Sequence, residues 1–185
     1  MDVARPTGAD SGKDGRGVGI ADFNGDGRLD LVINNNNETP TLYLNNLKKS
    51  GHAVELKLVG AHGGGDRVGV RSSRDAIGAC VRLTAGGKTM TRQVEAGSGY
   101  ASEVMRPLHF GLGGAEHVDA IEITWPSGLV QRMAGASLDA AGGVDRLVTI
   151  EEGGDPSGLV ALARPPSRPA PLAGTPRSGS NGATH

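Results

Sequence analysis

The sequence has 185 residues, a formal net charge of −1 and 31 glycines, and only 3% of its residues are aromatic. A chain so close to neutral has no charge signature for binding a polyanion, which argues against a nucleic-acid partner. No stretch approaches the roughly 18 apolar residues of a membrane-spanning helix, and residues 1–5 lack the apolar core of a signal peptide. Frequent glycines and a core limited to Val, Ile, Leu and Ala predict an all-β protein with many turns.

Residues 1–50 predict a flexible start followed by a small unit of β-strands. Residues 1–14 are rich in Gly, Asp and Lys without periodicity, which favours a flexible N-terminus. Short alternating apolar runs at residues 17–21 and 29–33 predict two strands joined by a loop. A polar turn at residues 34–38 then leads to a third short strand at residues 41–44.

The loop between the first two predicted strands carries oxygen-bearing side chains at alternate positions. Calcium needs six to eight oxygens at about 2.3 to 2.6 Å, and a short loop supplies them when every second residue turns inward. Gly27 provides the sharp turn. The loop has no Cys or His, which favours Ca²⁺ over zinc or copper. The predicted ligands are the side chains of Asp22, Asn24, Asp26 and Asp30 and the backbone carbonyl of Arg28.

Two other interpretations of this loop are weaker. A plain hairpin turn is possible because Asn-Gly and Asp-Gly are turn signals. An EF-hand is excluded because Ile33, not a bidentate Glu, occupies the twelfth position counted from Asp22. Three carboxylates about 4 to 5 Å apart repel by roughly 3 to 4 kcal/mol per pair at an effective dielectric near 20, which favours a bound cation.

A second domain is predicted over residues 51–152. Residues 54–59 alternate apolar with charged side chains, and residues 78–85 and 88–95 form a hairpin around Gly86 and Gly87. Further strands are expected at residues 108–112 and 120–125, with the last at residues 147–150. Residues 153–185 hold six of the ten prolines and little apolar periodicity, which predicts a disordered tail.

Candidate catalytic groups in this domain are isolated. Cys80 is expected to be a small strand residue, and Ser98 lacks the sequence of a nucleophile elbow. The histidines at positions 52, 62, 109 and 117 lack metal-ligand spacing. Because no acid, base and nucleophile converge, the sequence predicts a protein that is not an enzyme.

Two features could contact a partner. Trp125 is expected in the core, although sugars also stack on such residues. The loop from Arg67 to Arg74 is either a solvated loop or a site for an anionic glycan or a partner's carboxylates.

Residues 18–33 resemble the Asp-rich loop of FG-GAP or VCBS repeats, which form calcium-binding blades of β-propellers. Four ordered motifs, at residues 73–79, 97–100, 109–113 and 125–128, are similar to the ASPIC/UnbV domain of the cartilage acidic protein family. The resemblance implies one propeller-type blade hairpin over residues 15–50, then a β-sandwich-like ASPIC/UnbV domain. Because one blade hairpin is marginal in water, we expect upstream propeller repeats in a longer chain.

The resemblance also implies a function. The expected role is a non-enzymatic, calcium-binding interaction or adhesion module, the C-terminal part of a secreted or surface β-propeller protein. Its expected location is extracellular or periplasmic. The partner would be an unidentified protein or glycan. One alternative is a lectin-like domain that binds glycan through Trp125 and the loop from Arg67 to Arg74. The other is an accessory protein of enediyne-type natural-product biosynthesis, a pathway class associated with some bacterial relatives.

Overall fold

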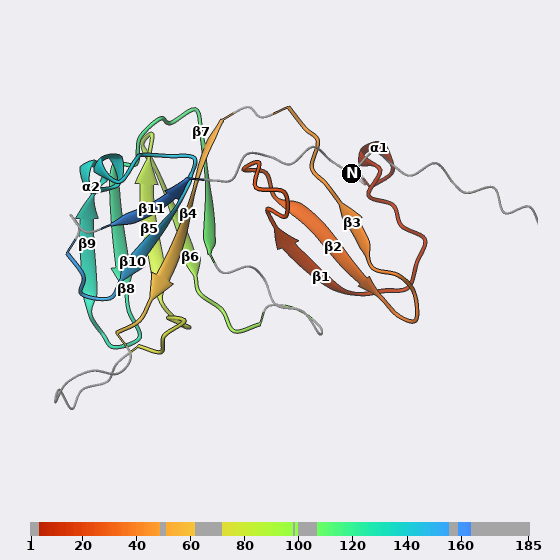
Figure 1. The fold of residues 1–185 in the computed structure, drawn as a ribbon, viewed down its shortest axis with the longest axis horizontal. Coiled ribbons are helices and arrows are strands. Elements are labelled where there is room, and N and C mark those ends of the chain that lie inside the picture. Colours follow the sequence, from red (N-terminus) through yellow and green to blue (C-terminus); the bar gives the residue numbers. More distant parts are fainter. Residues whose placement is uncertain are drawn as a thin grey trace, which may run out of the picture.

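The computed structural model describes residues 4–48, 51–61, 72–97, 99, 107–155 and 159–163. Its regular elements are almost all strands, in one three-stranded and two four-stranded sheets, which confirms the all-β prediction. Figure 1 shows the three-stranded sheet drawn apart from the two four-stranded ones. None of the helices in the described ranges has the length and apolar character to cross a bilayer.

The first three strands form sheet A, in the order β1-β2-β3. They are β1 (Gly15–Ala21), β2 (Asp30–Asn35) and β3 (Thr41–Tyr43), all antiparallel to their neighbours. The predicted strands at residues 17–21, 29–33 and 41–44 are therefore confirmed to within about two residues. The oxygen-rich loop is the connection between β1 and β2.

Both faces of sheet A are apolar. Val18 pairs with Ile33 on one face, and Val32 pairs with Leu42 on the other. Val18 is 45% exposed and Leu42 is 51% exposed. A sheet with one solvated face normally alternates apolar and polar residues, so this pattern is typical of a sheet that packs on both sides.

Sheet B has the order β11-β10-β4-β7. Its central strand β4 (His52–Val59) runs parallel to β10 (Arg146–Glu151) and antiparallel to β7 (Leu108–Gly113). The edge strand β11 (Val160–Ala163) pairs antiparallel with β10. Both edges of β4 are thus occupied within sheet B.

Sheet C has the order β6-β5-β8-β9 and is fully antiparallel. The predicted hairpin is confirmed as β5 (Cys80–Ala85) and β6 (Lys88–Gln93). Gly86 and Gly87 turn it with φ values of +54° and +72°, which side chains resist. The other two strands are β8 (Ala120–Thr124) and β9 (Val130–Ala134).

Sheets B and C enclose a common hydrophobic core and form a two-layer sandwich. The alternation predicted for β7 is confirmed, since Leu108, Phe110 and Leu112 are buried and His109 lies on the other face. The buried side chains facing them from sheet C are Val81, Leu83, Ile121, Ile123 and Met133.

Three expectations need correction. Residues 1–14 include a short helix, α1 (Ala4–Thr7), and β9 leads into an unpredicted helix, α2 (Gly135–Ala140). The strand at residues 147–150 is not the last, because β11 follows it. The predicted disordered tail is therefore wrong at residues 160–163, while residues 164–185 lie outside the described part. These elements are too short to show periodicity, and β11 forms by pairing with β10.

Candidate metal loop and adjoining surfaces

The loop from Asp22 to Asp30 turns at two glycines. Gly25 and Gly27 have φ values of +74° and +90°, the left-handed region that favours glycine. Between them the chain folds back on Asp22, whose Oδ1 accepts the Asp26 N–H at 3.0 Å and whose Oδ2 accepts the Gly27 N–H at 2.7 Å. The turn expected at Gly27 is present.

Asp26 lies at the centre of the loop, with its side chain only 7% exposed. Its Oδ1 accepts the Arg28 N–H at 2.9 Å, and its Oδ2 accepts a hydrogen bond from Asn24 Nδ2 at 2.7 Å. The same Oδ2 pairs with the Arg28 guanidinium. The Nε of Arg28 donates to the Asn45 carbonyl at 2.6 Å. Arg28 therefore joins the loop to the segment that follows β3.

Asp30 makes a second connection to that segment. It is 1% exposed, and its Oδ2 accepts the Phe23 N–H at 2.9 Å. Its Oδ1 accepts the Asn45 N–H at 2.8 Å, and Asn45 Nδ2 donates to the Leu29 carbonyl at 3.3 Å. The side chain of Asp30 thus positions the loop and the end of β3 together.

The predicted ligand residues share this loop, and their donor set is entirely oxygen, which fits a hard cation. No group of three or more Asp, Glu, His or Cys side chains among the described residues is close enough to hold a metal. A cation would therefore also need the amide oxygen of Asn24 and the carbonyl of Arg28. The backbone N–H groups that donate to the loop carboxylates do not exclude a bound cation, because each carboxylate offers about four acceptor positions. The guanidinium of Arg28, however, would have to leave Asp26.

Sequence reasoning missed two parts of this arrangement. It assigned only the backbone carbonyl of Arg28, whereas the guanidinium pairs with Asp26 and its Nε donates to Asn45. It gave Asn45 no role, although Asn45 contacts both Arg28 and Asp30. Asn45 is 15 residues from Asp30, so no local pattern reports their contact.

A cluster of hydrogen-bond donors around the Glu152 carboxylate was also missed. The Oε1 of Glu152 accepts hydrogen bonds from Ser72 Oγ at 2.9 Å and from Ser127 Oγ, and its Oε2 accepts the Ala61 N–H at 2.8 Å. Burial alone raises the pKa of the Glu152 carboxyl. The hydrogen bonds from Ser127, Ala61 and Ser72 outweigh burial, so the pKa lies below its ordinary 4.5. Glu152 thus ties three separate segments together as an anion.

Trp125 is a core residue. It is 2% exposed, and its Nε1 donates to Gln131 Oε1 at 3.0 Å. The ring is not available for a sugar to stack on, so the sugar-stacking role suggested for Trp125 is wrong. Of the arginines named with it, Arg74 is exposed, while Arg67 and Arg71 lie outside the described residues.

Three histidines form separate pairs with carboxylates. His52 Nδ1 lies 2.7 Å from Asp145 Oδ2, and His109 Nδ1 lies 3.5 Å from Glu55 Oε1. The third pair joins His117 Nδ1 to a carboxylate oxygen of Asp139 at 3.2 Å. Cys80 is a half-buried free thiol in β5. His62 and Ser98 lie outside the described residues.

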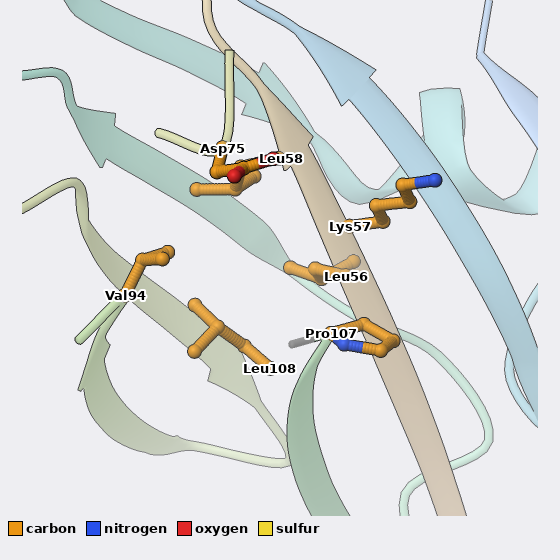
Figure 2. A pocket seen from close by; sticks show the side chains of 7 residues that line it. All are labelled: Leu56, Lys57, Leu58, Asp75, Val94, Pro107 and Leu108. Atoms are coloured by element: carbon orange, nitrogen blue, oxygen red, sulfur yellow. The ribbon is translucent and has the colours of Figure 1, made fainter. Parts of the chain in front are cut away.

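A pocket of about 310 Å³ opens at the edge of the sandwich, and Figure 2 shows its lining. Leu56, Leu58 and Leu108 belong to the hydrophobic core. The carboxylate of Asp75 lies beside Leu58, and the Lys57 side chain points away from the leucines. The pocket is therefore an opening into the core rather than a convergence of reactive groups. Its full lining is Leu56, Lys57, Leu58, Asp75, Val94, Pro107 and Leu108.

Comparison with known proteins identifies both parts of the chain. Residues 15–51 match the family model of the FG-GAP repeat, and residues 69–156 match that of ASPIC and UnbV. Cartilage acidic protein 1 of Xenopus tropicalis is 33% identical over 126 residues, which are 63% of this chain and 17% of the relative. The proteins of the same name from Mus musculus and Homo sapiens are 30% identical over 123 residues, 62% of this chain and 17% of each relative.

The two matches follow the division seen in the structure. The FG-GAP match covers sheet A and its loop, and the ASPIC and UnbV match covers all of sheet C with β7 and β10 of sheet B. Strand β4 lies outside the second match, yet it is a central strand of sheet B. The chain therefore contains an FG-GAP repeat, whose matched residues include sheet A, followed by an ASPIC and UnbV domain, whose matched residues include sheet C with β7 and β10.

Proposed function

We propose that this chain is a non-enzymatic interaction or adhesion module from the C-terminal part of a secreted or surface β-propeller protein. The chain spans only about 17% of the relatives it matches. The proposed whole protein carries further blades upstream, is extracellular or periplasmic, and binds a protein or glycan.

The observation that carries this proposal is the pair of apolar faces on sheet A. One face carries Ile20, Leu31 and Tyr43 side by side across the three strands, and the other carries Val32 beside Leu42. A propeller blade packs against a neighbouring blade on each side, so both of its faces must be apolar. Sheet A meets this requirement, which supports its role as a blade beside others.

We further propose that the loop binds Ca²⁺. The side-chain oxygens of Asp22, Asn24, Asp26 and Asp30 and the carbonyl of Arg28 would hold the ion. The bound ion would supply a cross-link that neutralises the carboxylates and stabilises the folded loop. Because Asp30 and Arg28 both contact Asn45, stabilising the loop would also stabilise the end of β3.

The arrangement of polar groups supports binding rather than catalysis. The Glu152 carboxylate is engaged by hydroxyl and amide donors, so it acts as a structural anchor. The histidines that the structure describes pair separately with carboxylates at the positions given above. The described residues around the pocket in Figure 2 bring no nucleophile to a general base.

The calcium proposal is tested by hydrogen exchange of the full chain in excess Ca²⁺ and in chelator. An ion bound only by the folded form adds about 2.7 kcal/mol at a hundredfold excess over Kd. Exchange in β1, β2 and β3 should therefore slow by up to about a hundredfold. The fluorescence of Trp125, which is in the sandwich, should report the same urea midpoint with and without the ion.

Two variants complete the test. Asp26→Ala should abolish the calcium effect on sheet A, while Asp10→Ala, which removes an exposed carboxylate outside the loop, should preserve it. Equal exchange of the wild-type protein in Ca²⁺ and chelator would contradict the calcium site. If Ca²⁺ slowed exchange equally in the sandwich and in sheet A, and did so in every variant, the ion would be binding nonspecifically.

A further inference from the structure

The two edges of sheet A differ in how they discourage strand addition. Strand β1 has a register shift between Gly15 and Gly17, and Arg16 pairs with Asp14 at 2.8 Å. Bulges and charges of this kind protect an edge strand from pairing. Strand β3 consists only of Thr41, Leu42 and Tyr43 and follows directly on Pro40, but it contains no charge or bulge of its own. Of the two edges, that of β3 is therefore the less protected, and no other strand of the described residues pairs with it.

A groove of about 600 Å³ runs along β3. Leu42 and Leu47 in its lining are 51% and 72% exposed. Pro6, Thr7 and Ala9, from α1 and the residues after it, line the same groove, and Figure 1 shows α1 near β3. None of the described lining residues is charged: Pro6, Thr7, Ala9, Leu29, Leu31, Leu42, Tyr43, Leu44, Asn45, Asn46 and Leu47. The groove thus suits an uncharged, apolar occupant.

Strand β3 is held at both ends before anything binds. Asn35 Nδ2 donates to the Thr39 carbonyl at 2.7 Å and to Thr41 Oγ1 at 3.0 Å. At the other end, Asn45 is bound by Asp30 and Arg28. A fixed edge loses little conformational entropy on binding, which favours recognition by main-chain hydrogen bonds.

The following strand of this chain cannot complete sheet A along β3. The next strand is β4, and its two edges are already paired with β10 and β7. A propeller blade typically has four strands, whereas sheet A has three among the described residues. An additional strand at β3 has to come from a segment other than β4.

We propose that the free edge of β3 is a strand-addition site for an extended, uncharged segment of a partner protein, with apolar residues at alternate positions. The segment adds antiparallel to β3, as β2 does on the opposite edge. Because Pro6, Thr7 and Ala9 line the same groove as β3, it accommodates one extended segment and not the whole sheet of a second copy. This inference rests on the proposal that the chain is an interaction module, and it names the chemistry of the partner.

A peptide copying residues 31–35, which is uncharged once acetylated and amidated, is a suitable test partner for the full chain when it is fluorescently labelled. In sheet A these residues pair Leu31 with Tyr43, Val32 with Leu42 and Ile33 with Thr41. We expect saturable binding by fluorescence anisotropy. A control peptide carrying Val32→Pro, which loses a ladder hydrogen bond, should bind at least tenfold more weakly. Equal binding of the two peptides would overturn the proposal.

Hydrogen exchange then locates the peptide. Binding at the free edge should slow exchange in β3 without accelerating exchange in β2. Faster exchange in β2 would mean that the peptide displaces that strand, which would overturn the proposed site. Sedimentation of the protein alone should show a monomer. Self-association that Leu42→Lys abolishes would instead assign the edge to a second copy and overturn the proposal.

Variants of the protein distinguish peptide binding at the β3 edge from nonspecific hydrophobic binding. Leu42→Lys places a charge on the edge and should weaken peptide binding at least tenfold. Leu47→Lys, at a groove residue outside the strands, should do the same without depending on the stability of β3. Leu129→Lys, a 41% exposed site on the sandwich, is the matched control and should bind normally. Unchanged binding by Leu42→Lys and Leu47→Lys would overturn the proposal.

The calcium experiment remains separate from this one. The response of the loop to the ion is measured by exchange without peptide, and peptide affinity is measured in both Ca²⁺ and chelator. If exchange in sheet A is the same with and without Ca²⁺ while the peptide binds, only the calcium site is contradicted. A peptide that fails to bind while the loop responds to calcium contradicts only the edge.

Discussion

The buried carboxylate of Asp30 accepts the N–H of Asn45 at 2.8 Å, although the two residues are 15 positions apart. Its other oxygen accepts the N–H of Phe23 in the loop at 2.9 Å. Asp30 therefore has a structural role that does not depend on a metal. This makes Asp30 different from Asp26, whose contacts lie within the loop itself.

Asp30→Asn should destabilise sheet A even in chelator. The amide group of Asn presents a donor toward one of the two backbone N–H groups, so one buried hydrogen bond is lost, at a cost of about 1.5 to 3 kcal/mol. Hydrogen exchange over β1, β2 and β3 measures the change, and Asp10→Asn serves as the exposed control. A loss of protection confined to calcium-containing buffer would show instead that Asp30 acts only as an ion ligand.

Arg28→Ala should have opposite effects with and without calcium. In chelator it removes the ion pair with Asp26 and the hydrogen bond to Asn45, which should lower the stability of sheet A by about 1 kcal/mol. With the competing cation gone, Ca²⁺ affinity should rise several-fold, because a nearby like charge no longer opposes the ion. Calorimetric titration of both proteins measures this, and weaker binding by the variant would contradict competition at Asp26.

Glu152→Gln should make the stability of the sandwich less dependent on pH. The folded-state pKa of Glu152 lies below its ordinary 4.5, so the ionised group stabilises the fold fully above pH 4.5. That contribution is lost as the pH falls through the folded-state pKa. The variant should be less stable by about 1 to 3 kcal/mol near pH 7, with a difference that shrinks in acid.

Urea unfolding followed by Trp125 fluorescence at several pH values measures the Glu152 effect. Ser127→Ala removes one of the hydroxyl donors and should lower stability in the same pH range by a smaller amount. If the difference in unfolding free energy between the wild type and Glu152→Gln stayed constant as the pH fell, the carboxylate charge would not be what stabilises the cluster.

Trp125→Ala should destabilise the sandwich by about 3 to 5 kcal/mol, because it removes a large side chain from a close-packed core. Trp125→Phe should lower stability by a smaller amount because it keeps an aromatic ring in the core, although it loses the hydrogen bond to Gln131. Urea unfolding monitored by circular dichroism compares them. A Trp125→Ala protein of normal stability that lost glycan binding would instead restore a lectin role for this residue.

Gly135→Ala should strongly destabilise the junction between β9 and α2. A Cβ added at Gly135 would lie 1.5 Å from the Val118 carbonyl oxygen, so the backbone would have to move. We expect a loss of about 1 to 3 kcal/mol or more. Gly114→Ala, with open space around its Cβ position, is the control. Equal stability of the two variants would show that the junction adjusts freely.

The strands and the oxygen-rich loop could be predicted because their signals are local. Alternation of apolar residues identified β4 and β7, and the Gly86 and Gly87 pair identified the hairpin of β5 and β6. The spacing of Asp22, Asn24 and Asp26 brought the expected residues into one loop. Whether that loop binds Ca²⁺ stays a prediction.

Other features were decided only when distant segments came together. Glu55 pairs with Leu147 in the parallel ladder of β4 and β10, and Glu152 receives hydrogen bonds from Ser72 and Ser127. No sequence window contains both partners of such contacts. Strand β11 exists as a partner of β10, in a region whose composition favoured disorder.

The amino-acid order alone determined where chain segments extend and turn, because side-chain alternation and glycine act over a few residues. It also determined which oxygen atoms are available in the loop. The tertiary structure decided that Trp125 is enclosed in the core, that Arg28 and Asp30 reach Asn45, and that β3 is an edge strand among the described residues. Those outcomes depend on which faces the folded chain buries together, and burial is a property of the whole packed molecule.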